Sequence, residues 1–159
     1  MRSSFLSSVI ASVISLAVLP SIALADAPKI EKLRAFLIYE DSGDTSKNMA
    51  AKADSGDTIV ASDDKGQSIQ MRVDIVMSGK ANQLYENNPV LHVVVHGSDP
   101  GTPPIVNAEF PLTFMAKDKL FRTMVVDHNC NGVNIDAYMM DGKKKTSELK
   151  KSFSITCGD

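Results

Sequence analysis

Three histidines are the residues of this sequence best suited to chemistry, because imidazole is both a common metal ligand and a common acid–base group. His92 and His96 lie four residues apart, a spacing that would let them share a metal ion on a helix. The valines between them, residues 93–95, favour a strand, on which the two side chains would share a face about 13 Å apart. His128 lies near Cys130 and would form a ligand pair only with a reduced cysteine. If residues 90–96 form a strand, His92 and His96 are therefore too far apart to bind the same metal ion.

Two acidic turns form a second candidate metal site, because carboxylates on tight glycine turns suit calcium. The sequence Asp-Ser-Gly-Asp-Thr occurs at residues 41–45 and again at residues 54–58. The candidate calcium ligands are Asp41, Asp44, Asp54 and Asp57. Neither copy has the alternating acids and the distal glutamate of an EF-hand loop. Asp, Ser and Gly also favour turns by themselves, so solvated turns are the preferred interpretation.

Methionines offer a third type of ligand, because thioether and imidazole groups together bind copper. Met71, Met77 and Met139 nevertheless fall on the apolar faces of predicted strands, which is typical of core packing. Copper binding therefore rests on ligand chemistry alone and is kept as an alternative. No cofactor is predicted.

The sequence contains no catalytic motif that we can assign. It has no Gly-x-Ser-x-Gly elbow, no His-Glu-x-x-His and no glycine-rich phosphate loop. Residues 96–99 read His-Gly-Ser-Asp and include a base, a nucleophile and an acid, but the members of a catalytic triad converge from separate elements. We expect a protein that is not an enzyme, and a hydrolase is the second alternative.

The two cysteines, Cys130 and Cys157, are predicted to form a structural disulfide in an oxidising compartment. Closing this loop would stabilise the fold by about 3 kcal/mol in the chain-entropy estimate. Redox-active pairs usually lie closer together in sequence. Cys157 shares one face of a predicted strand with Phe153 and Ile155, which predicts that its side chain points into the core.

A cluster of lysines is the candidate binding surface. The cluster follows the turn at residues 141–142 and comprises Lys143, Lys144 and Lys145, with Lys150 and Lys151 further along the chain. Such a cluster would suit phosphates of lipid A or acidic polymers of a cell envelope. Lysines on a strand also discourage edge-to-edge association, and this is the preferred interpretation.

The hydrophobic pattern predicts an all-β domain, and its strands would position these residues. Apolar and polar residues alternate most clearly in residues 69–77, 133–139 and 153–157. Further strands are predicted at residues 33–40, 58–62, 90–96, 105–110 and 120–127, with turn residues between them. One short helix is predicted at residues 46–53, capped by Thr45 or Ser46. Seven or eight short strands predict an immunoglobulin-like β-sandwich.

The first 25 residues are predicted to be a cleaved signal peptide. Arg2 precedes a long apolar run, and small residues end it at Ala23 and Ala25. The mature chain, residues 26–159, would then be one domain that is periplasmic or secreted. It has no second apolar run of membrane-spanning length. The full chain has a formal charge of −2, which gives no electrostatic reason to expect nucleic-acid binding.

The leading functional hypothesis is an exported, non-enzymatic domain that binds a protein or a cell-envelope component through its sheet faces or loops. An exposed edge strand or apolar patch would support this hypothesis. The alternatives are a periplasmic copper- or calcium-binding protein and a hydrolase. The partner's identity and the oligomeric state stay open.

Overall fold

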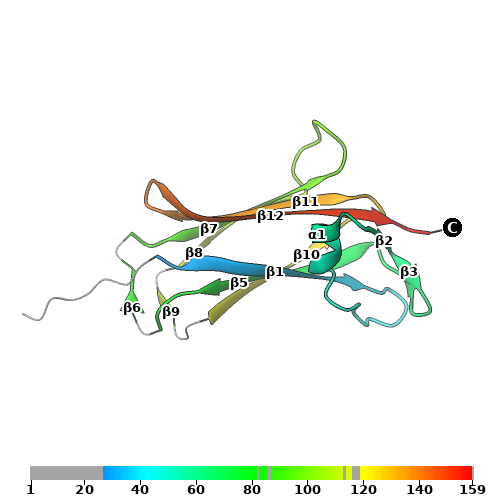
Figure 1. Ribbon diagram of the computed structural model, residues 1–159, viewed down its shortest axis with the longest axis horizontal. Coiled ribbons are helices and arrows are strands. Elements are labelled where there is room, and N and C mark those ends of the chain that lie inside the picture. The colour runs from blue at the N-terminus through cyan, green and yellow to red at the C-terminus, as the bar shows by residue number, and fades with distance from the viewer. Residues whose placement is uncertain (1–26, 82, 86, 113, 116–118, 159) are drawn as a thin grey trace, which may run out of the picture.

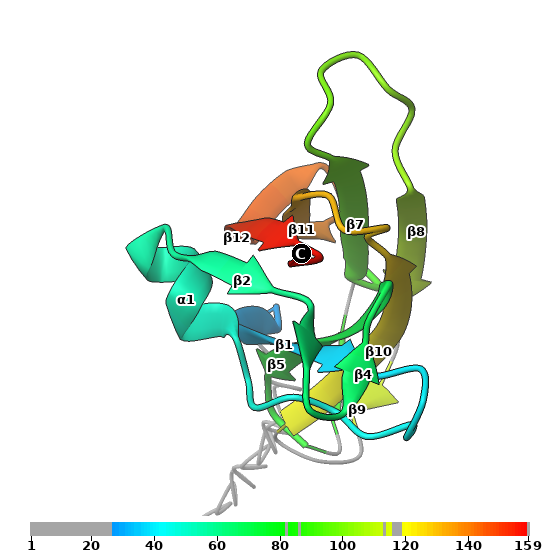
Figure 2. The same cartoon turned by 90° about the vertical axis from the view of Figure 1, so that its right-hand side faces the viewer.

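The computed structural model describes residues 27–81, 83–85, 87–112, 114–115 and 119–158. The predicted signal peptide, residues 1–25, lies outside these ranges. The described residues confirm the all-β prediction, since they form two principal sheets, two short two-stranded sheets and one short helix (Figure 1). The two principal sheets lie one above the other, and the chain between β7 and β8 extends away from both layers (Figure 2).

The smaller principal sheet has three antiparallel strands with β5 in the centre. In spatial order these strands are β1 (Lys29–Ile38), β5 (Gln70–Ser78) and β10 (Lys119–Asp127). The larger sheet has five strands, in the order β2 (Thr58–Val60), β12 (Lys144–Thr156), β11 (Val133–Asp141), β7 (Val90–Gly97) and β8 (Val106–Pro111). Its pairs are antiparallel except that β2 runs parallel to β12. The two-stranded sheets pair β3 (Ser62–Asp63) with β4 (Gly66–Gln67), and β6 (Gln83–Leu84) with β9 (Phe114–Met115).

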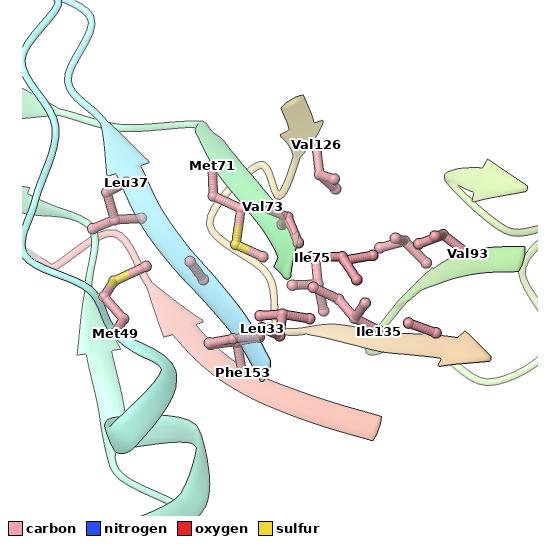
Figure 3. Close-up of a cluster of buried hydrophobic side chains, with 14 of the residues drawn as sticks. Leu33, Leu37, Met49, Met71, Val73, Ile75, Val93, Val126, Ile135 and Phe153 are labelled. Carbon is pink, nitrogen blue, oxygen red and sulfur yellow. The ribbon is translucent and has the colours of Figure 1, made fainter. Parts of the chain in front are cut away.

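The core lies between the two principal sheets and follows from the alternation of residues along the strands. Apolar residues two apart point to the same face of a strand, so each strand contributes a row of side chains to the interior. The central strand β5 contributes Met71, Val73 and Ile75, all fully buried. Ile135 of β11 and Phe153 of β12 meet this row from the opposite sheet (Figure 3). The methionines predicted to be core residues, Met71, Met77 and Met139, are indeed fully buried.

The strand prediction is confirmed for the eight strands of the principal sheets, with shifted boundaries. The largest difference is β12, which begins at Lys144 rather than near residue 153. The lysine-rich first half of β12 lacks a regular apolar pattern, but its backbone pairs with β11 along the whole length of that strand. Cross-strand pairing therefore extended β12 beyond the segment whose side chains are buried.

The predicted helix at residues 46–53 is wrong at its start, because α1 spans Ala50–Ser55. Neither Thr45 nor Ser46 caps it; the N-cap residue is Met49, which makes no side-chain cap hydrogen bond. The reason is a competing interaction with β1. The Ser46 hydroxyl accepts a hydrogen bond from the N–H of Leu37 at 2.9 Å. Residue 46 therefore bonds to the edge of β1 instead of capping the helix.

Candidate functional site

The structure places His92 and His96 on β7, as the strand prediction requires. The His92 ring stacks on Tyr138 of β11, with ring centroids 4.8 Å apart, and its Nδ1 lies 3.2 Å from a carboxylate oxygen of Glu109 on β8. His96 is exposed and lines a surface hollow of about 390 Å³ with Asp136 and neighbouring residues of β11 and β12. The two histidines thus have different neighbours and do not converge on a common point.

His128 is buried, with 2% of its surface exposed, and belongs to a hydrogen-bonded cluster next to the disulfide. The backbone N–H of Cys130 donates to its Nδ1 at 3.1 Å, so Nδ1 is the unprotonated nitrogen. Its Nε2 lies 3.4 Å from the Ser68 hydroxyl, which itself donates to the carbonyl of Gln70 at 2.7 Å. A catalytic serine–histidine pair needs the opposite arrangement, in which Nε2 accepts the hydroxyl proton. Burial also lowers the pKa of His128, although the nearby Asp127 carboxylate opposes this shift.

Three of the four candidate calcium ligands contact other side chains. Asp44 lies 3.6 Å from the ammonium of Lys65, and Asp54 forms an ion pair with Lys151 of β12. Asp57 accepts a hydrogen bond from the hydroxyl of Ser55 at 2.6 Å. Asp41 is exposed in the turn after β1. Across the described ranges, no three His, Cys, Asp or Glu side chains lie close enough together to hold a metal ion.

The structure joins Cys130 and Cys157 in a disulfide, with Cα atoms 5.0 Å apart. Cys157 directly follows the end of β12 on the same alternate positions as the buried Phe153 and Ile155, but it is only half-buried. The side-chain amide of Gln67 donates to its sulfur at 3.0 Å. The alternation of burial continues through Cys157, but β12 ends at Thr156, so the disulfide lies at the margin of the core.

Several lysines of the candidate binding surface are paired with acidic side chains. Lys143 and Lys144 are exposed at the β11–β12 turn, whereas Lys145 lies 3.0 Å from Glu148 and above the ring of Tyr138. Farther along β12, Lys150 contacts Asp136 at 2.8 Å and Glu148 at 3.2 Å, and Lys151 pairs with Asp54. Opposite charges thus neutralise much of the cluster, consistent with a solvated face of the larger sheet.

A second surface hollow, of about 400 Å³, lies beside β1 and α1. Tyr39 and the ammonium-bearing Lys47, Lys52 and Lys65 are among its lining residues. Burial, followed by a hydrogen bond to Asp63, raises the pKa of Tyr39 to about 12. The Tyr39 hydroxyl therefore stays protonated and is a hydrogen-bond donor to Asp63 rather than a base.

The outer face of the three-stranded sheet is the most distinctive surface of the described residues, and no motif pointed to it. This outer face comprises Arg34 and Phe36 of β1, Arg72 and Asp74 of β5, and Phe121, Thr123 and Val125 of β10. Two of its apolar side chains, Phe121 and Val125, are 47% and 52% exposed. Phe121 and Val125 share this face of β10 with Thr123 between them. Exposed apolar side chains of this kind are characteristic of interaction surfaces when they form a continuous patch.

Asp74 organises this outer face from its centre. It is only 5% exposed, and a buried carboxylate must be paired or hydrogen-bonded. Its oxygens accept hydrogen bonds from Arg34 at 3.0 Å and from the hydroxyl of Thr123 at 2.9 Å, and Arg72 lies 3.5 Å away. The three strands are adjacent in the register, so each contributes one partner. This arrangement holds both guanidinium groups in place across the sheet.

The two arginines also lie against the aromatic rings of the outer face. The guanidinium carbon of Arg34 lies 5.2 Å from the centre of the Phe121 ring, and that of Arg72 lies 4.4 Å from the centre of the Phe36 ring. These distances are within the range of cation–π attraction. The outer face is therefore a connected, preorganised surface of rings and guanidinium groups.

The sequence does contain a signal for this face that strand alternation alone did not reveal. In residues 33–38 the apolar side chains are not confined to one face, because Phe36 and Ile38 lie on the face opposite to Leu33 and Leu37. In residues 119–127, Phe121 and Val125 likewise lie opposite the core-facing Val126. Apolar residues on both faces of an edge strand would have indicated a second, unburied apolar surface.

Comparison with known proteins does not assign this chain to a family. The chain matches no protein-family model, and no curated protein matches its sequence. No helix in the part of the chain that the structure describes has the length and apolar character to cross a membrane.

Proposed function

We propose that this chain is an exported, non-enzymatic binding domain that docks a protein or a cell-envelope component on its outer face. The observation that carries this proposal is the exposure of Phe121 and Val125 beside two arginines that stack on phenylalanine rings. Aromatic and arginine side chains are enriched among the residues that contribute most binding energy at protein interfaces. A rigid surface also loses little conformational entropy when it binds.

The charges of the outer face indicate the chemistry of its partner. Arg34 and Arg72 share the single carboxylate of Asp74, which leaves an excess of positive charge. A partner with carboxylates near an apolar contact would complement this surface. We therefore propose an acidic, partly apolar partner surface.

The finer assignments from the sequence belong to this proposal. An immunoglobulin-like arrangement of the sandwich, a signal peptide at residues 1–25 and a periplasmic or secreted location all fit an exported binding domain. The Cys130–Cys157 disulfide supports an oxidising compartment, where such bonds persist. The candidate metal ligands lie apart, so no observation favours the copper or calcium alternative.

Site-specific photocrosslinking in the native compartment tests the proposal. Phe36→p-benzoylphenylalanine places the reactive group on the outer face, and Asn107→p-benzoylphenylalanine places it on exposed β8 of the other sheet as a matched control. We expect a discrete crosslinked product from residue 36 alone, and we expect Arg72→Glu in the same chain to abolish it. Equal crosslinking at both positions, or none at residue 36, would contradict docking on the outer face.

A further inference from the structure

The outer edge of β10 carries backbone groups to which no described residue is bonded, because β10 pairs with β5 alone. The direction of these groups follows from the neighbouring ladder. The N–H of His128, one residue past β10, donates to the carbonyl of Ile69 at 2.8 Å. Hydrogen-bonded pairs alternate in an antiparallel ladder, so the even-numbered residues of β10 bond to β5. The odd-numbered residues point their N–H and C=O groups away from β5; they are Lys119, Phe121, Thr123, Val125 and Asp127.

The other three edges of the principal sheets are short or protected. The outer edge of β1 is covered by residues 44–49, and β2 has only three residues. β8 has six residues, ends at Pro111 and is preceded by Pro104. β10 has nine residues, contains no proline and has no covering segment among the described residues. A strand edge of this kind is a template for pairing with another strand.

We propose that β10 pairs antiparallel with β10 of a second copy of this chain, with Thr123 opposite Thr123 across a two-fold axis. In this register Phe121 of each copy is opposite Val125 of the other, and Lys119 is opposite Asp127. All of these residues point their backbone groups toward the second copy, so each pair exchanges both N–H···O hydrogen bonds. The contact is isologous and closes on itself, as two-fold interfaces do.

Side-chain complementarity selects this register. The pairing sets an aromatic residue against a β-branched one twice, and such cross-strand pairs stabilise sheets. It also sets a lysine against an aspartate at both ends of the contact, and no like charges oppose one another. Moving the two-fold axis to Phe121 or to Val125 would lose the Lys119–Asp127 pairs. The same strand therefore fits itself in one register better than in the adjacent ones.

This self-pairing does not depend on the proposed docking function. It uses the backbone edge of β10, whereas the photocrosslinker at Phe36 reports on the outer face from the far strand of the sheet. A dimer would join the outer faces of both copies into one continuous surface. Failure of either proposal can thus be observed without failure of the other.

Cysteine crosslinking of the mature, disulfide-bonded protein tests the register. Cα atoms of a hydrogen-bonded antiparallel pair are about 5.5 Å apart, a separation that a disulfide spans. We expect Thr123→Cys to form a covalent dimer under mild oxidation, detected by intact mass. Val125→Cys is the matched control, because the two copies of residue 125 would lie more than about 13 Å apart along the strands. We expect this control to stay uncrosslinked.

A charge exchange tests the same contact without a new cysteine. Asp127→Lys and Lys119→Asp each place like charges at both ends of the pairing, and we expect each to weaken dimerisation about tenfold in sedimentation equilibrium. Mixing the two variants restores opposite charges at both ends, so a heterodimer should form with at least the original affinity. A protein that stays monomeric at every concentration, or equal crosslinking of Thr123→Cys and Val125→Cys, would overturn the proposal. Crosslinking of Thr123→Cys to a different protein would also overturn it, in favour of a partner strand.

Discussion

The two edges of the three-stranded sheet differ in how their outward backbone groups are bonded. On β1, the N–H groups of Ala35, Leu37 and Tyr39 are bonded to Asn48, Ser46 and Asp44 respectively, at 2.9–3.0 Å. The carbonyls of Ala35 and Leu37 accept the N–H groups of Met49 and Ser46. On β10, the corresponding groups have no bonded partner among the described residues.

Of these two edges, only that of β10 is free of a covering segment among the described residues. Backbone groups that are already hydrogen-bonded cannot template another strand, whereas unpaired ones can. The segment at residues 44–49 acts as an additional irregular strand, anchored by an isolated bridge between Ile38 and Thr45. No described segment covers the outer edge of β10, and the His128 cluster and the disulfide follow beyond the end of the strand.

Removing the disulfide beyond the β10 edge should lower the free energy of unfolding more than any change at the β1 edge. Cys130→Ser with Cys157→Ser should lower the free energy of unfolding by about 3 kcal/mol, because the unfolded chain regains the freedom of a closed loop of about 27 residues. Urea unfolding measures the change, and amide exchange should quicken near His128 more than at Leu37 of β1. A loss below about 1 kcal/mol would show that the β10 end is held by its other contacts.

Opening the protected edge should have the next largest effect. The Asn48 side-chain oxygen accepts the N–H groups of Ala35 and Ala50 at 3.0 and 3.2 Å. Asn48→Ala leaves both donors without this partner and should cost about 2 kcal/mol of stability, with faster exchange of the Ala35 amide. Asn48→Asp keeps the acceptor and should retain most of the stability. Equal losses in both variants would show that the carboxamide oxygen is not what holds residues 44–49 on β1.

The smallest effect is a pH dependence at the end of β10. Burial lowers the pKa of His128 in the folded state, so the unfolded chain takes up a proton first as the pH falls below about 6.5. Stability should therefore be unaffected by His128 above this pH and decrease below it, by no more than about 1.4 kcal/mol per pH unit. His128→Gln should flatten the dependence relative to His96→Gln, whose histidine is exposed. Parallel stability curves for the two variants would contradict this assignment.

Most of the fold could be predicted because strand alternation is a local property. Residues 69–77 show on their own that Met71, Val73 and Ile75 share a face, and that face is buried. The helix start was wrong because Ser46 and Asn48 bond to β1, an interaction between segments that local capping rules do not include. Cys157 is less buried than Phe153 and Ile155, because β12 ends one residue before it, an end point that the alternation does not mark.

The candidate site was less predictable than the fold. The outer face depends on Asp74 meeting Arg34 and Thr123, which lie 40 and 49 residues away in sequence. The separation of the histidines, in contrast, followed from the strand prediction at residues 90–96. Predictions that used spacing within one strand were therefore more informative than those that needed two strands to meet.

By itself, the sequence determined the all-β class, the principal strands, the core-facing residues and the cysteines available for a disulfide. These follow from the period of two along a strand and from residue chemistry. Only the tertiary structure decided that β1 is covered while β10 is open, and that arginine, phenylalanine and aspartate side chains meet on the outer face. The physical reason is that strand order and sheet edges are set by hydrogen bonds between distant segments, which no local pattern records.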